Sequence, residues 1–179
     1  MNSSAKILIG LALLLGAFLI GKPLYMQPDY DDGEVAPNFT GTNLQGLSFD
    51  LQDLKGQYVL VEFWGSWCGP CIREIPDLRG LYRTFNGKEY KHARNFEIVS
   101  IAVEQSQKRW PKAVEKYDLD WPYHTLDLAT DLRFFDSPIA NAYGVKEVPT
   151  SFFLNPEGKI LGVNWKATQI SEYLSEDLK

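Results

Sequence analysis

The sequence predicts an α/β domain built on a mixed central β-sheet flanked by helices. Two runs of mainly β-branched and aromatic residues, 58–64 and 96–103, are almost uninterrupted, as strands buried on both faces of a sheet are. Each run is followed by a segment with apolar residues at steps of three and four, which indicates an amphipathic helix. Two short apolar runs around a turn near the C-terminus predict a closing hairpin, so the sheet is expected to be mixed.

The N-terminal residues predict a segment that directs the chain to a membrane. Residues 7–21 are uncharged, almost wholly apolar and preceded by Lys6, as in a signal peptide or a signal anchor. As a helix this run would span roughly 22 Å, which favours a signal peptide. Because no small-residue cleavage site follows it, and because Lys6 and Lys22 can lengthen the effective span, we expect an uncleaved anchor.

The rest of the chain is expected to form a linker and one domain. An acidic, turn-rich stretch at 28–34 predicts the linker, with a surface loop packed on the domain as the alternative. We therefore expect a signal segment at 1–24, an acidic linker at 25–35 and a folded domain at 36–179, a length that suits a single core. The formal net charge of −5 gives no electrostatic footprint for nucleic acid.

The remaining elements are predicted from periodicity and turn residues. Alternation within 44–51 predicts a short strand or hairpin at the N-terminal side of the domain, ahead of a polar turn at 53–57. Pro76 lies inside the helix that follows the first central strand, which predicts a kink. The expected helices are 71–82, 107–117, part of 132–143 broken by Pro138, and 168–178, and the further strands are 123–126, 150–154 and 159–163.

The only two cysteines, Cys68 and Cys71, lie on a turn between the strand 58–64 and the next helix. A cysteine at a helix N-terminus faces free backbone N–H groups and the positive end of the helix dipole, which favour the thiolate. We expect Cys68 to be the more exposed, nucleophilic sulfur, and Cys71 to be the buried sulfur that attacks a mixed disulfide on Cys68. Pro70 suits the first helical turn, and Gly69 lets the backbone of a partner come close.

Two other roles for the cysteines are weaker. A structural disulfide across two intervening residues would close a very small loop and contribute little stability. A zinc site would need two more ligands, and the two histidines, His92 and His124, show no paired ligand spacing. The pair therefore favours thiol–disulfide chemistry without a metal.

The residues around the cysteines resemble thioredoxin. Trp-Cys-Gly-Pro-Cys stands at 67–71 after a second tryptophan, Trp64, and Val-Pro-Thr stands at 148–150. The Ala-Pro-Asn-Phe opening at 36–39 and an extra region at 104–147 are more similar to the membrane-tethered TlpA/ResA-like branch. The resemblance implies a thioredoxin-like fold with an insertion in that region. It further implies an extracytoplasmic thiol–disulfide oxidoreductase, often serving cytochrome c maturation or oxidative protein folding, whose redox group is its own disulfide.

The resemblance also assigns substrate-binding roles. Pro149 matches a proline that is cis in this family and faces the cysteine pair. A turn proline before a strand is the simpler alternative. Of the two tryptophans, Trp67 is expected to line the docking surface and Trp64 to pack beneath it. The expected substrate-binding residues are Trp67, Gly69, Pro70, Val148 and Pro149.

Glu62 is the third candidate catalytic residue. It lies six residues before Cys68, where thioredoxins carry a buried Asp that exchanges a proton with the second cysteine. Strand alternation puts Glu62 on the side of Leu60 and Trp64, under the active-site helix. A carboxylate buried there has a raised pKa and can take the proton of Cys71. The alternative is a solvated glutamate that faces the edge.

Two rival functions use related sequence features. A peroxiredoxin of the AhpC/TSA kind opens similarly, but it needs Thr three and Pro seven residues before its reactive cysteine, where this chain has Gly65 and Val61. A Sco-like copper-binding chaperone spaces its cysteines by three residues and adds a later histidine, for which His124 is the candidate. A peroxide assay and a copper titration would distinguish these two functions from thiol–disulfide oxidoreduction.

The expected partners follow from the leading interpretation. They are proteins with disulfide bonds as substrates, a membrane-spanning or extracytoplasmic thiol reductant, and the membrane itself through residues 7–21. We expect no nucleic acid, no metal and no cofactor beyond the Cys68–Cys71 disulfide.

Overall fold

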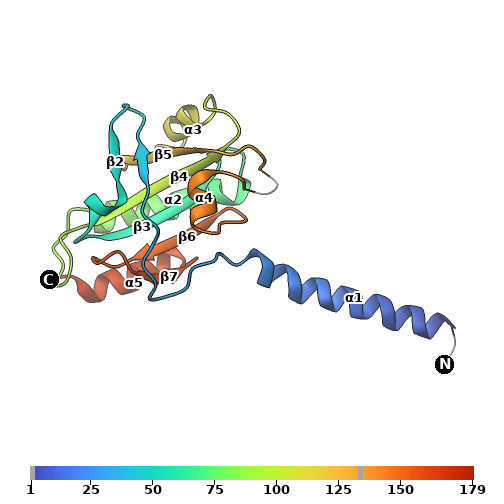
Figure 1. Cartoon of the computed structure of the whole chain (residues 1–179). Helices are drawn as coiled ribbons and strands as arrows, with labels where there is room; N and C mark the ends of the chain where they lie inside the picture. The colour runs from blue at the N-terminus through green and yellow to red at the C-terminus, as the bar shows by residue number, and fades with distance from the viewer. Residues whose placement is uncertain (1–2, 133–134) are drawn as a thin grey trace.

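A computed structural model describes residues 3–132 and 135–179 of the chain. Its centre is a five-stranded sheet (Figure 1) made of β3 (Tyr58–Trp64), β4 (Phe96–Glu104), β5 (Tyr123–Leu128), β6 (Thr150–Leu154) and β7 (Ile160–Val163). The strand order is β5-β4-β3-β6-β7. β4 is parallel to β3 and β5, whereas β6 is antiparallel to β3 and β7. The predicted mixed sheet is therefore confirmed.

One face of the sheet carries three helices. They are α2 (Gly69–Phe85), α3 (Trp110–Lys116) and α5 (Ala167–Asp177). Buried side chains of these helices form one hydrophobic cluster with the even-numbered residues of β3, such as Leu60 and Trp64. α2 is amphipathic, and it therefore buries one stripe and leaves the other in solvent.

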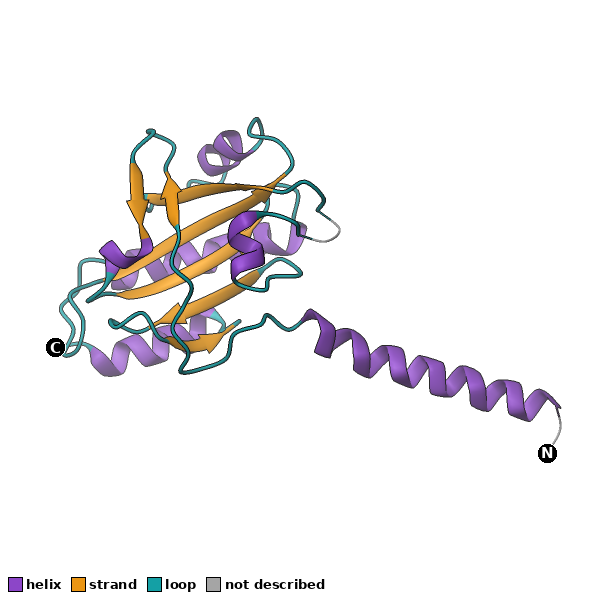
Figure 2. Cartoon of the chain, in the orientation of Figure 1, coloured by secondary structure: helices purple, strands orange, loops and turns teal. Residues whose placement is uncertain are grey.

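The other face carries smaller elements (Figure 2). They are β1 (Thr40–Thr42) and β2 (Ser48–Asp50), which pair as a hairpin, the 3-10 helix η1 (Leu51–Leu54) and α4 (Pro138–Ala142). Together with odd-numbered residues of β3, such as Val61 and Phe63, they form a second hydrophobic cluster. Successive side chains of a strand point to opposite faces, which is why β3 supplies both clusters and is buried along its whole length.

Several predicted elements differ in detail. The hairpin expected within 44–51 lies slightly earlier, and residues 51–54 form η1. The prediction that Pro138 breaks a helix is wrong. Pro138 instead begins α4, at a position where the missing N–H of a proline needs no partner. Residues 133–134 of that expected helix lie outside the described residues. Pro76 lies inside α2, as expected.

The N-terminal segment forms α1 (Ser3–Met26), which extends away from the domain (Figure 1). The large apolar side chains between Ile7 and Ile20 are exposed. Within the described residues, no helix combines the length and the apolar character that crossing a membrane requires. The signal or anchor role of residues 7–21 stays a prediction.

The acidic stretch expected to be a free linker packs on the domain instead. Gly33 and Glu34 form backbone hydrogen bonds with Ile160 at the edge strand β7. Asp29 pairs with the Lys146 ammonium at 2.9 Å. These contacts satisfy backbone groups that an isolated tether would leave to water. The alternative of a packed surface loop is the correct one for these residues.

Candidate active site

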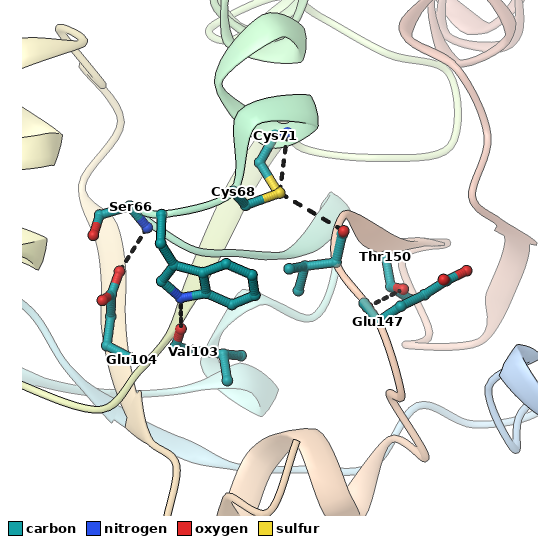
Figure 3. The surroundings of a disulfide bond; sticks show 9 residues. Ser66, Cys68, Cys71, Val103, Glu104, Glu147 and Thr150 are labelled. Carbon is teal, nitrogen blue, oxygen red and sulfur yellow. Dashed lines mark hydrogen bonds between the residues drawn. A yellow bond between two sulfur atoms is a disulfide. The ribbon is translucent and has the colours of Figure 1, made fainter. Parts of the chain in front are cut away.

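The two cysteines form a disulfide where β3 passes into α2 (Figure 3). Their Cα atoms are 5.3 Å apart. Cys68 is the N-cap of α2, and the backbone N–H of Cys71 donates to its Sγ over 3.2 Å. Pro70 occupies the first turn of the helix, where its missing N–H needs no partner. The positive end of α2 therefore points at the sulfur of Cys68, which favours its thiolate in the reduced form.

Both sulfurs are more enclosed than the sequence suggests. Cys68 is 4% exposed and Cys71 is 1% exposed. The predicted order, with Cys68 more exposed than Cys71, is confirmed, and in the disulfide form both residues are buried. Cys68 lies against the loop of Val148, whose carbonyl oxygen is 3.7 Å from its Sγ. Gly69 and Pro70, between the two cysteines, are exposed.

The two neighbouring tryptophans differ in exposure as predicted, and the docking role of Trp67 stays a prediction. Trp67 is 40% exposed beside Cys68, whereas Trp64 is fully buried beneath it. The indole N–H of Trp67 donates to the Val103 carbonyl over 3.0 Å, which fixes the ring on the surface. A Cβ at Gly65 would lie 2.6 Å from that ring, so a larger residue here would displace the Trp67 side chain.

Glu104 is a site residue that the sequence analysis missed. It ends β4, it is buried, and its Oε1 accepts the backbone N–H of Ser66 over 2.6 Å (Figure 3). This bond fixes the turn that carries Trp67 and the first cysteine. The available signal was its place at the C-terminal end of a parallel strand next to the cysteine strand, where functional groups gather in open α/β sheets.

The Val148–Pro149 peptide bond is cis, as the resemblance implies. Thr150, the next residue, donates its hydroxyl to the Glu147 carbonyl over 2.7 Å, which closes this turn (Figure 3). The Val148 carbonyl lies against the Cys68 sulfur. The turn thus faces the cysteine pair, and its substrate-binding role stays a prediction.

Glu62 is buried on the α2 face of the sheet, on the side predicted from alternation. It is 6% exposed, and the Ser100 hydroxyl donates to its Oε2 over 2.8 Å. Burial raises the pKa of Glu62 to about 8, because desolvation disfavours the charged form more than the single bond from Ser100 favours it. The solvated alternative is therefore wrong, and Glu62 can exchange a proton near neutral pH.

A pocket of about 720 Å³ opens between α2, β6 and α5, beside the cis-proline turn. Its acidic lining includes Glu62 and two residues of α2 that sequence reasoning missed, Glu74 and Asp77. Burial, followed by the charge of Asp77, raises the pKa of Glu74. On the α5 side the lining includes Lys166 and Glu172. Glu62 is thus one of the residues that line this pocket.

The histidines do not join the cysteines. His124 is buried on β5 and stacks on Trp121, with ring centroids 5.4 Å apart. His92 pairs with Asp177 near the C-terminus. Within the described residues, no group of three or more His, Cys, Asp or Glu side chains could hold a metal ion. The expected lack of a metal and of a separate cofactor stays a prediction.

Comparison with known proteins places these features in a family. Residues 33–163 match the profile of the AhpC/TSA family. The chain is 33% identical over 174 residues to the thiol-disulfide oxidoreductase ResA of Bacillus thuringiensis subsp. konkukian, across 94% of this chain and 91% of that protein. ResA of Bacillus subtilis is 32% identical over 157 residues, across 88% and 80% of the two chains.

Solved structures give the same picture. The thioredoxin domain of a thiol-disulfide oxidoreductase from Bacteroides vulgatus matches with a TM-score of 0.69 and 30% identity, across 82% of this chain and 99% of that one. StoA from Bacillus subtilis matches with a TM-score of 0.58 and 25% identity, across 78% and 97%. The predicted thioredoxin-like fold and the likeness to the ResA-like branch are confirmed.

Proposed function

Because this chain belongs to the AhpC/TSA family and is a thiol–disulfide oxidoreductase, we propose that it reduces disulfide bonds of other proteins outside the cytoplasm. The observation that carries this proposal is the Cys68–Cys71 disulfide at the N-terminus of α2, facing a cis-proline turn. The helix end favours a thiolate on Cys68, and the turn offers a surface on which an extended client segment can lie.

The proposed cycle moves two electrons. The Cys68 thiolate attacks a client disulfide, forming a mixed disulfide and releasing one client thiolate. Cys71 then gives its proton to Glu62 and its thiolate attacks the Sγ of Cys68, which breaks the mixed disulfide and frees the second client thiolate. The client has gained two electrons, and the enzyme holds the Cys68–Cys71 disulfide. A partner dithiol, the expected membrane-spanning or extracytoplasmic reductant, must supply two electrons to regenerate it.

The direction of electron flow is the finer part of the proposal. Gly69 and Pro70 between the cysteines resemble the pair in reducing members of the thioredoxin family. A reductase for cytochrome c maturation fits this direction and the likeness to ResA. The experiment is equilibration of the purified chain with glutathione, followed by reduction of a disulfide-bonded protein such as insulin. A reducing potential with turnover supports the proposal, and an oxidising potential contradicts it.

A peroxidase is the second candidate, because the matching family profile carries the AhpC/TSA description. Gly65 and Val61 stand where a peroxiredoxin needs Thr and Pro before its reactive cysteine. Peroxide consumption with a thiol donor tests this candidate directly. Rapid consumption that depends on Cys68 and persists in Cys71→Ser would favour the peroxidase over the reductase.

We also propose that residues 7–21 export the chain or tie it to a membrane. The support is the run of exposed apolar side chains on α1, which are costly to leave in water. Labelling of intact cells with a membrane-impermeant maleimide, after mild reduction, tests the location of the cysteines. Cysteines that react in intact cells support export, and cysteines that react only after lysis contradict it.

A further inference from the structure

A row of polar side chains crosses the hydrophobic sheet beneath α2. In the strand register Glu62 of β3 lies beside Ser151 of β6 on one side and Ser100 of β4 on the other. Ser100 in turn lies beside His124 of β5. The reaction described above uses only Glu62 of this row. The other groups are buried or partly buried in a layer where polar atoms are costly unless they are hydrogen-bonded.

Two hydrogen bonds connect Trp121, which precedes β5, through Ser100 to Glu62, and the donor of each is defined. The indole N–H of Trp121 donates to Ser100 Oγ over 2.9 Å, and Ser100 Oγ donates to Glu62 Oε2 over 2.8 Å. An indole nitrogen can only donate, so the serine oxygen is the acceptor of the first bond. The one hydroxyl hydrogen of Ser100 is then free for the carboxyl oxygen of Glu62. The chain of donors runs from Trp121 to Ser100 to Glu62.

Packing fixes the side chains of this hydrogen-bonded series. Ser100 is fully buried and Trp121 is 3% exposed. The Trp121 ring is stacked on His124 and tilted against Tyr82, with ring centroids 5.4 and 5.8 Å away. Neither neighbour donates to Glu62, and burial lowers the pKa of His124 to about 4, so this imidazole is neutral at pH 7. The indole N–H therefore has a single well-defined orientation.

The charged groups around Glu62 do not replace this donor. Like charges come from α2, where Glu74 raises the pKa of Glu62, and Asp77 lines the same pocket. On the α5 side of the pocket, Lys166 and Glu172 carry opposite charges. Among the described hydrogen bonds, the one from Ser100 is the bond that favours the carboxylate form.

We infer that Ser100, oriented by Trp121, is a positioning residue that fixes the Glu62 carboxylate as the acceptor of the Cys71 proton. The inference rests on the proposed function for its role in the reaction. Ser100 takes no proton itself: the Cys71 proton moves to Glu62, and the hydroxyl and indole protons stay on their own atoms. By stabilising the charged carboxylate, the pair keeps the acceptor form accessible nearer to neutral pH than an apolar site would.

The test is a titration of the Glu62 carboxyl by carbon NMR in the disulfide form, with Glu62→Gln used to assign the signal. Ser100→Ala is expected to raise the pKa of Glu62 by about one unit, because a hydrogen bond to a charged group is lost. Trp121→Phe keeps the ring and removes only the N–H, so it is expected to raise this pKa by less. In the resolving step, the pH dependence of client release is expected to shift by the same amount.

Two variants control for general disturbance of the core. Trp110→Phe changes a buried tryptophan of the same hydrophobic cluster whose indole nitrogen has no partner in the described residues. Ser151→Ala changes the serine on the other side of Glu62 in the row. Both are expected to leave the Glu62 titration nearly unchanged. An unchanged titration in Ser100→Ala, or equal shifts in Trp110→Phe and Trp121→Phe, would overturn the inference.

The titration and the proposed function can fail separately. The NMR measurement needs no client and no turnover, so a shifted titration in an enzyme that reduces no protein disulfide would contradict the function and leave the hydrogen-bond chain in place. Normal reduction with an unshifted Glu62 titration in Ser100→Ala would contradict the inference and leave the function in place.

Discussion

Two carboxyl groups, buried at opposite ends of β3, behave in opposite ways. Asp177, near the start of the strand, accepts from the Tyr58 hydroxyl over 2.9 Å and from the His92 backbone N–H over 3.2 Å, and it also pairs with the His92 ring. Burial alone would raise its pKa, but these bonds hold the pKa of Asp177 below its ordinary value. Glu62, near the other end, has one bond from Ser100, and burial raises its pKa to about 8.

The comparison distinguishes a buried carboxyl group with a structural role, Asp177, from one with a proposed catalytic role, Glu62. The donors of Asp177 favour its charged form, and through them Asp177 ties the C-terminal helix to Tyr58 and to the loop at His92. A carboxyl group that is buried with few donors stays close to changing its charge. Asp177 thus lies at the Tyr58 end of β3, whereas Glu62 lies near the end that leads into Cys68.

The largest effect that would test this contrast is on the reaction rate. Glu62→Gln removes the acceptor of the Cys71 proton and is expected to slow release of the mixed disulfide roughly 100-fold near pH 7. Asp177→Asn is the matched control, because it neutralises a buried acid near the opposite end of β3 and is expected to leave the release rate nearly unchanged. Stopped-flow measurement of client release gives both rates, and equal slowing in the two variants would remove the assigned role of Glu62.

The next effect is on stability at alkaline pH. The ordinary pKa of glutamate is 4.5, so folding holds a proton on Glu62 between that value and about 8, and the free energy of unfolding falls as pH rises through this range. Glu62→Gln removes this loss and is expected to stabilise the protein at pH 9 by about 3–5 kcal/mol. Urea unfolding at pH 5 and pH 9 measures it, and a variant without gain at pH 9 would contradict a protonated Glu62.

Asp177 is expected to give the opposite sign. Its lowered pKa contributes stability above the ordinary value of 3.8, and that contribution is lost as pH falls through the lowered pKa. Asp177→Ala leaves the Tyr58 hydroxyl and the His92 N–H without their acceptor and is expected to destabilise the domain by about 2–3 kcal/mol at pH 7. The same unfolding experiment measures this loss; stabilisation at pH 7 would refute the anchoring role.

The smallest expected effect tests a single hydrogen-bond donor to Asp177, the Tyr58 hydroxyl. Tyr58→Phe removes one hydroxyl from Asp177 and keeps the ring that packs on Tyr90 and Phe153. It is expected to cost about 1 kcal/mol at neutral pH and to raise the pKa of Asp177 toward its ordinary value. Tyr82→Phe, a tyrosine of α2 with no bond to Asp177 among those described, serves as the control for the titration.

The features that the sequence could predict are those encoded locally. Spacing alone identifies the cysteine pair, alternation along 58–64 predicts the face of Glu62, and the Val-Pro-Thr motif implies the cis bond at Pro149. The prediction for Pro138 was wrong, because a proline that interrupts a helical pattern also suits the first turn of a new helix.

The features that were missed depend on contacts between distant segments. Ser100 and Trp121 are unremarkable in the sequence, and only the pairing of β3 with β4 brings the serine to Glu62. Glu104 likewise meets the Ser66 N–H only because two parallel strands end side by side. The enclosure of Cys68 also comes from a distant segment, the loop at Val148, which no local pattern reveals.

Trapping with a resolving-cysteine variant tests the account most directly. Cys71→Ser keeps Cys68 as the nucleophile and removes the sulfur that releases the client, so it is expected to accumulate mixed disulfides with client proteins that dissolve on addition of dithiothreitol. Cys68→Ser is the control and is expected to trap none. If Cys71→Ser forms no mixed disulfide in cells, or if Cys68→Ser forms as many, Cys68 is not the attacking sulfur and the proposed cycle is wrong.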